Sequence, residues 1–226
     1  MDYSRIRSSG QWAKPPADTP ADPRHSQSRR RTGRSPIRAV ESNVGSKAQR
    51  PVLTIGHSTR PIDEFIAVLT GNGVKHLLDI RTVPRSRHNP QFNRDALPTS
   101  LGTAGIAYDH LPGLGGFRPT SPESPNGGWR NASFRGYADY MQTPEFAREL
   151  ERVVALAADE QVALMCAEAV PWRCHRSLVA DALLVRGVEV EEIVSPARRA
   201  PHRLTPFARV RGTSITYPAL DAAAPA

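Results

Sequence analysis

Short apolar runs alternate with amphipathic segments over most of the chain, and this alternation predicts strands and helices in turn. Buried strands are predicted at residues 52–56, 76–80, 106–108, 162–165 and 188–194. Helices, in which apolar residues recur at helical spacing, are predicted at residues 61–71, 135–141, 144–158 and 177–186. This order of elements predicts an α/β fold, in which a mostly parallel sheet carries helices on both faces in three layers.

Composition divides the chain into a tail and a domain. Residues 1–50 lack apolar periodicity, so we expect a disordered basic tail there, while residues 51–218 are expected to form a single α/β domain and residues 219–226 a disordered end. The tail holds eleven Lys and Arg against four Asp and Glu, whereas residues 51–226 hold nineteen against eighteen. The basic charge therefore indicates, at most, a weak non-specific contact of the tail with nucleic acid.

The sequence contains no apolar run of membrane-spanning length, and the N-terminus lacks the hydrophobic core of a signal peptide. We therefore expect a cytoplasmic protein without a membrane partner. Its two cysteines, Cys166 and Cys174, are then expected to be reduced rather than joined in a structural disulfide.

Polar side chains stand where the predicted strands end. In a parallel sheet, the carboxyl ends of the strands meet at one edge, where ligands bind. We therefore expect one cleft to collect the candidate residues, namely His57, Ser58, Asp79, Arg81, Cys166, Glu168, Cys174, His175 and Arg176.

Their chemistry suits an anionic ligand. Arg176 opposes the dipole at the start of the helix that follows Cys174, and an anion in the cleft would explain this placement. Arg81 and Arg176 are the candidate anion-binding groups. Proton transfer is assigned to His57 and His175, acid, base or orienting roles to Asp79 and Glu168, and the nucleophile to Cys174 or Cys166.

Each group also has a structural alternative. Asp79 and Arg81 lie on the same side of a strand and can pair with each other. His57 and Ser58 can cap the next helix, Glu168 can pair with a nearby arginine, and Cys166 can be a small buried apolar residue.

A metal site built from Cys166, Cys174, His57 and Asp79 is disfavoured, because the adjacent Cys174 and His175 do not easily share one ion and the cysteine spacing is unusual for zinc. No metal ligand and no cofactor is assigned. The glycine-rich turn at Gly115 and Gly116, in the predicted long loop 112–131, lacks the phosphate-binding glycine patterns and is interpreted as a tight turn or a lid.

Several motifs, in this order, resemble the bacterial family called domain of unknown function 488. They are Thr54-Ile55-Gly56-His57-Ser58, Asp79-Ile80-Arg81 with Pro84 and Ser86, Leu114-Gly115-Gly116, Phe134-Arg135-Gly136-Tyr137 with Tyr140-Met141, Leu164-Met165-Cys166-Ala167-Glu168, Cys174-His175-Arg176, His202-Arg203-Leu204-Thr205-Pro206 and Tyr217-Pro218. The resemblance covers residues 52–218 and implies an α/β domain with a site at the strand ends. It adds Tyr137, Gly115 and Gly116 to Ser58 as candidate substrate contacts, and it implies no reaction.

Three functions follow. The first is an enzyme acting on a phosphorylated or other small anionic substrate. The second is a non-catalytic module that binds nucleotides or nucleic acid. The third is a thiol redox protein using Cys166 and Cys174, which requires the two sulfur atoms to face each other.

Overall fold

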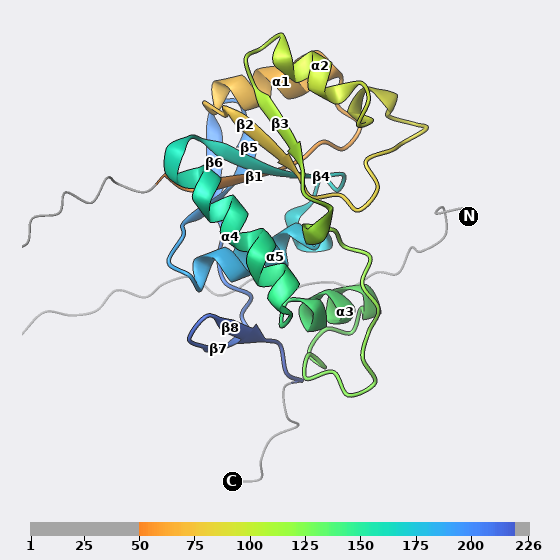
Figure 1. Cartoon of the computed structure of the whole chain (residues 1–226), viewed down its shortest axis with the longest axis vertical. Coiled ribbons are helices and arrows are strands. Elements are labelled where there is room, and N and C mark those ends of the chain that lie inside the picture. The colour runs from red at the N-terminus through yellow and green to blue at the C-terminus, as the bar shows by residue number, and fades with distance from the viewer. Residues whose placement is uncertain (1–49, 220–226) are drawn as a thin grey trace, which may run out of the picture. The chain divides into compact units, whose positions relative to one another are not determined.

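A computed structural model describes residues 50–219, and its centre is a six-stranded sheet with the order β3-β2-β4-β1-β5-β6 (Figure 1). The strands are β1 (Val52–Gly56), β2 (His76–Asp79), β3 (Ala107–His110), β4 (Val162–Cys166), β5 (Val190–Ser195) and β6 (Arg198–Pro201). The first five run parallel, and β6 pairs antiparallel with β5. The predicted mostly parallel sheet is confirmed. The expectations for the tail at 1–49, including its contact with nucleic acid, and for 220–226 lie outside the described residues.

Helices cover both faces of the sheet, as predicted. They are α1 (Ile62–Gly71), α2 (Leu97–Gly102), α3 (Ala132–Tyr140), α4 (Pro144–Asp159) and α5 (Arg176–Leu184). Alternate residues of the strands enter two separate hydrophobic clusters, since Leu77 packs with α1 and α2 while Leu78 packs with α3, α4 and α5. None of the helices in the described part of the chain is both long and apolar enough to cross a membrane.

The boundaries of the predicted elements shift by a few residues, and short elements were missed. The third strand begins at Ala107 and reaches His110, while the fifth begins at Val190. The sequence pattern did not predict α2 or β6, nor the hairpin of β7 (Arg209–Arg211) and β8 (Ser214–Thr216). It also did not predict the 3-10 turns η1 (Pro90–Phe92), η2 (Pro112–Leu114) and η3 (Pro171–Arg173). The missed strands are three or four residues long and mostly exposed, so they carry no apolar pattern.

The connections between the parallel strands reverse direction between β1 and β4, which creates a topological switch point there. From β1 the chain passes through α1 to β2 on one side, whereas from β4 it passes through α5 to β5 on the other side. The helices that follow β1 and β4 therefore leave over opposite faces of the sheet. A crevice at the carboxyl ends of two such strands is where doubly wound sheets bind ligands.

Candidate functional site

The two cysteines meet at the end of β4. Cys166 is the last residue of this strand, and Cys174 follows the turn η3. Their Sγ atoms lie 2.7 Å apart, and the thiol of Cys174 donates to Cys166 Sγ. Both side chains are buried and both are free cysteines, although residues 167–169, 172 and 173 of the intervening loop are exposed. The loop thus folds back and brings together two thiols that are eight residues apart.

The surroundings of this pair favour a negative charge on Cys166. The hydrogen bond from Cys174 is the largest cause that lowers the pKa of Cys166, to about 7, against the opposing effect of burial. Backbone N–H groups of Glu168 and Ala167 and the charge of Arg176 lower it further. The same hydrogen bond, together with burial, raises the pKa of Cys174. Cys166 is therefore the more acidic thiol of the pair, and Cys174 is its hydrogen-bond donor.

Arg176 is the cation next to the pair and the first residue of α5. Its side chain is 1% exposed, and its Nη1 donates to the carbonyl oxygens of Ile55 and Glu168, at 3.1 Å each. Its Nε lies 3.9 Å from a carboxylate oxygen of Glu192. The predicted anion-binding side chain is thus held by protein oxygens. The Glu168 contact uses the backbone carbonyl, not the carboxylate.

His175 stands beside the thiols, just before α5. Its Nε2 lies 3.2 Å from the carbonyl oxygen of Ile80, and its Nδ1 lies 3.7 Å from Cys174 Sγ. Since a carbonyl oxygen only accepts, Nε2 carries the proton and Nδ1 presents its lone pair toward the sulfur. Burial lowers the pKa of His175 to about 4, against the hydrogen bonds to backbone carbonyls, so this imidazole is neutral at pH 7.

The glycine-rich turn and Tyr137 hold the His175 ring. A Cβ atom at Gly116 would lie 2.6 Å from His175 Nδ1, and one at Gly115 would lie 2.4 Å from Thr82 Oγ1. The Tyr137 ring centroid lies 5.0 Å from that of His175, and its hydroxyl donates to the carbonyl oxygen of Leu114. Tyr137 and Gly116 thus contact His175, whereas Gly115 lies against Thr82. The predicted contacts of these three residues with a substrate remain predictions.

A second polar cluster lies at the end of β2. Arg81 donates from Nε and Nη2 to the two carboxylate oxygens of Asp79, at 2.8 Å and 2.5 Å. The hydroxyl of Tyr108 also donates to Asp79, and Arg81 Nη2 reaches the carbonyl oxygen of Phe92. The alternative in which Asp79 and Arg81 pair with each other is confirmed. Their proposed roles toward a substrate remain predictions.

His57 links β1 to this cluster. Its Nδ1 donates to the carbonyl oxygen of Ser58, and its Nε2 accepts from Arg81 Nη1 at 3.2 Å. The ring stacks on Phe92 with a centroid distance of 4.1 Å. Burial is the main cause that lowers the pKa of His57, to about 4, so the ring stays neutral.

Ser58 has a left-handed backbone, with φ of 53°, and its N–H donates to the carbonyl oxygen of Ala167. The capping alternative for His57 and Ser58 is wrong. The cap of α1 is Pro61 without a side-chain hydrogen bond, because the Ser58 backbone pairs with the loop after β4 instead.

The structure therefore joins the candidates in two groups, the thiol group at β4 and the carboxylate–guanidinium group at β2. Backbone pairing places the two groups side by side. The His57 N–H donates to the carbonyl oxygen of Cys166, and the Ile80 N–H donates to the carbonyl oxygen of Met165. Sequence reasoning missed Phe92, Tyr108 and His110, whose Nε2 contacts the Arg81 carbonyl at 2.8 Å. The polar residues at alternate positions of β3 were a signal that could have found Tyr108 and His110.

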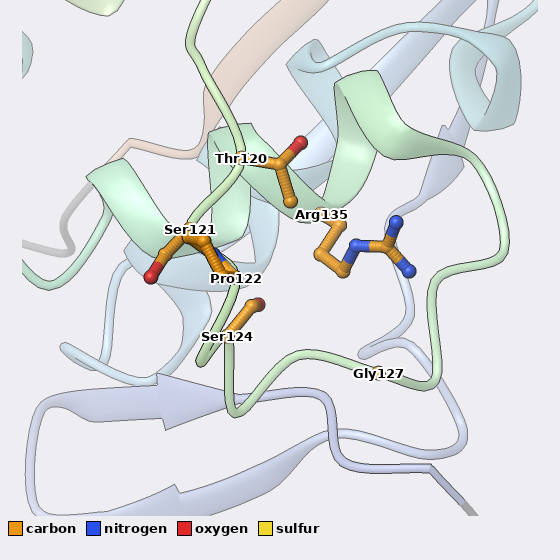
Figure 2. Close-up of a pocket in the computed structure, with 6 residues that line it drawn as sticks. All are labelled: Thr120, Ser121, Pro122, Ser124, Gly127 and Arg135. Carbon is orange, nitrogen blue, oxygen red and sulfur yellow. The ribbon is translucent and has the colours of Figure 1, made fainter.

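An open hollow of about 410 Å³ lies elsewhere, between the long loop and α3 (Figure 2). Figure 2 shows Thr120, Ser121 and Ser124 of the loop around the side chain of Arg135. None of the predicted site residues lines this hollow. It therefore adds nothing to the chemistry at the strand ends.

Fold and site together define a doubly wound α/β protein with a buried pair of thiols at the switch point of its sheet. The chain belongs to the family described as Domain of unknown function DUF488, whose family model matches residues 61–183. Neither the curated proteins nor the solved structures include a match. The matched range contains both cysteines, His175, Arg176, Asp79 and Arg81.

Proposed function

We propose that this protein is a thiol redox protein in which Cys166 and Cys174 interconvert between a dithiol and a disulfide. The separation of 2.7 Å between the two Sγ atoms is the observation that carries this proposal. A disulfide requires its sulfur atoms at about 2.05 Å, so closing the bond needs a small movement of the two side chains. The exposed loop between the cysteines provides the freedom for that movement.

The reaction partner is a disulfide of the form RS–SR, either a small molecule or a protein. The Cys166 thiolate attacks one sulfur of RS–SR, which forms a mixed disulfide and releases RS⁻. Cys174 then loses its proton to solvent and attacks Cys166 Sγ, which releases the second RS⁻. Both cysteines are thereby oxidised by two electrons in total, and RS–SR is reduced to two thiols after protonation.

Arg176 supports this role through its fixed charge. Its guanidinium is locked by the carbonyl oxygens of Ile55 and Glu168, and its positive charge favours a thiolate at Cys166. The anionic-substrate hypothesis would need free donors on Arg81 and Arg176. All three nitrogens of the Arg81 guanidinium have partners in the protein. Arg176 Nη1 donates to two carbonyl oxygens, and Arg176 Nε, which makes no hydrogen bond, is buried 3.9 Å from Glu192, so we place both arginines as supports of the site.

Three large apolar side chains are exposed on loops that follow strands of the sheet, and each is a candidate contact for a partner. Val83, Phe117 and Trp172 are 61%, 73% and 70% exposed, on the loops that follow β2, η2 and β4. The Phe117 N–H reaches Thr82 Oγ1, and the neighbouring Gly116 touches His175. Exposed apolar groups close to a buried reactive site are typical of a surface that receives a partner.

The test is a redox titration of the full chain. The reduced protein is equilibrated with mixtures of reduced and oxidised glutathione, the remaining thiols are alkylated, and the intact mass is measured. We expect both thiols to disappear together, with the loss of two hydrogen atoms and no stable glutathione adduct.

Cys166→Ser and Cys174→Ser are the matched controls. Each variant keeps one cysteine and cannot close the internal bond, so we expect the second step to fail in both. Cys174→Ser should then hold glutathione on Cys166 as the trapped mixed disulfide. Two thiols that stay alkylatable in fully oxidised glutathione would refute the proposed function.

A further inference from the structure

The geometry points to a zinc site in which the reduced protein binds one Zn²⁺ through Cys166 Sγ, Cys174 Sγ and His175 Nδ1. This inference rests on the proposed function only in that it uses the same two sulfur atoms in their reduced state. The three candidate ligand atoms all lie within 4.8 Å of one another. Two sulfurs and one imidazole nitrogen are donors that zinc prefers.

The orientation of His175 is what a metal ligand requires. A ligating histidine almost always donates its other ring N–H to a carbonyl or carboxylate oxygen, which fixes the tautomer. Here Nε2–H faces the carbonyl oxygen of Ile80 at 3.2 Å, while Nδ1 faces the thiols. Gly116 and Tyr137 pack against the ring and hold it in this orientation.

The backbone turns between Cys174 and His175, which allows adjacent residues to face one point. Cys174 is extended, with φ −127° and ψ 142°, whereas His175 is helical, with φ −54° and ψ −17°. The change of conformation brings Nδ1 to 3.7 Å from Sγ of the preceding residue. The sequence objection that neighbours do not share an ion therefore does not apply to this pair.

The ion would require the sulfurs to separate. Two Zn–S bonds of about 2.3 Å at a tetrahedral angle hold their sulfur atoms about 3.8 Å apart. The observed 2.7 Å lies between that value and a disulfide bond, so small side-chain movements lead to either state. The separation of Cys174 Sγ and His175 Nδ1 needs little change.

Three protein ligands leave the fourth position of a tetrahedral ion open. Structural zinc sites have four protein ligands, whereas catalytic sites have three and keep the last position for water or substrate. Among residues 50–219, no other His, Cys, Asp or Glu joins this group of potential ligands. The class of ligand that the site would accept is therefore a small molecule with a donor atom for zinc.

Zinc binding and the disulfide exclude each other, because the ion needs the thiolate sulfurs of Cys166 and Cys174 and the disulfide joins these sulfurs to each other. Oxidation of the loaded site by RS–SR forms the Cys166–Cys174 bond, reduces RS–SR to two RS⁻ and releases Zn²⁺. The redox state of the thiols then controls metal binding. Zinc, in turn, protects the thiols from oxidation.

The test titrates the reduced full chain with Zn²⁺ against a chromophoric chelator, and repeats the titration with Co²⁺. We expect one ion per chain and, with Co²⁺, sulfur-to-metal charge transfer together with the intense visible bands of a tetrahedral site. His175→Ala should weaken zinc by more than about 100-fold, beyond what loss of an outer-shell partner costs. His88→Ala is the matched control, because His88 is exposed and lies outside the site.

The outcomes separate the two proposals. Wild-type protein that forms the disulfide in glutathione but binds neither Zn²⁺ nor Co²⁺ overturns the zinc site and leaves the proposed function intact. Zinc binding that survives His175→Ala overturns the ligand assignment. If His175→Ala does not fold, the Co²⁺ spectrum of the wild-type protein is used instead. Octahedral bands without sulfur-to-metal charge transfer in that spectrum overturn the site.

Discussion

We expect the fold to lose stability at alkaline pH as His202 loses its proton. Its Nε2 lies 2.8 Å from a carboxylate oxygen of Asp181 on α5, and its Nδ1 lies 3.6 Å from Glu192 on β5. Burial lowers the pKa of His202, but the hydrogen bonds and charges of these two carboxylates outweigh it and raise the pKa to about 9. His202 is therefore charged at pH 7 and joins the C-terminal segment to the sheet.

The magnitude follows from the difference between the folded and unfolded pKa values. The unfolded value is 6.5, so the pair contributes its full stabilisation below pH 6.5 and loses it as the pH rises through about 9. Each pKa unit corresponds to about 1.4 kcal/mol, which gives a loss of about 3 kcal/mol across this range. The side chain of His202 is 10% exposed, so solvent screens this interaction little.

Urea unfolding below pH 6.5 and above pH 9 measures this loss, with His202→Gln as the test variant and His88→Gln as the exposed control. The wild type and His88→Gln should lose stability together as the pH rises. His202→Gln should start less stable and lack the same decline, so its deficit against the wild type should shrink with rising pH. A deficit that stays constant would refute the reasoning.

Three further substitutions test how the site is held. Gly116→Ala should destabilise the fold by about 1–3 kcal/mol, measured by urea unfolding, because the new Cβ would meet the His175 ring. Gly102→Ala is the control and should not destabilise the fold in this way, because nothing lies within 4 Å of its added Cβ. Arg176→Ala should cost about 2–5 kcal/mol, because it leaves a cavity and two unpaired carbonyl oxygens, and an unchanged urea midpoint would contradict that role. Tyr108→Phe should cost about 1 kcal/mol through the lost hydrogen bond to Asp79; a neutral result would show that this bond adds no net stability.

Much of the fold was predictable because its central elements carry strong patterns. The strand β4 is an uninterrupted apolar run, and α4 has a clear apolar face that includes Phe146, Leu150 and Val153. Such segments bury enough apolar surface to fix both their type and their place. By contrast, β6 reads Arg-Arg-Ala-Pro, and only its pairing with β5 makes it a strand.

The meeting of the candidate residues at one edge of the sheet was predictable, but the partners of their side chains were not. Parallel strands must bring their carboxyl ends to one edge, which places Asp79 and Cys166 near each other. Sequence spacing cannot show which groups within hydrogen-bond reach will pair. It left open whether Arg81 binds a ligand or Asp79, and whether the two sulfur atoms face each other.

Arg176 shows that an unusual placement in the sequence has compensating groups within the protein. A cation at the start of a helix lies against the dipole, and the sequence suggested an anionic ligand as compensation. In the structure, the carbonyl oxygens of Ile55 and Glu168 and the carboxylate of Glu192 supply that compensation. The positive charge of Arg176 also lowers the pKa of Cys166, and whether an external anion binds there stays a prediction. The arginine thus connects the helix start, the end of β1 and Cys166.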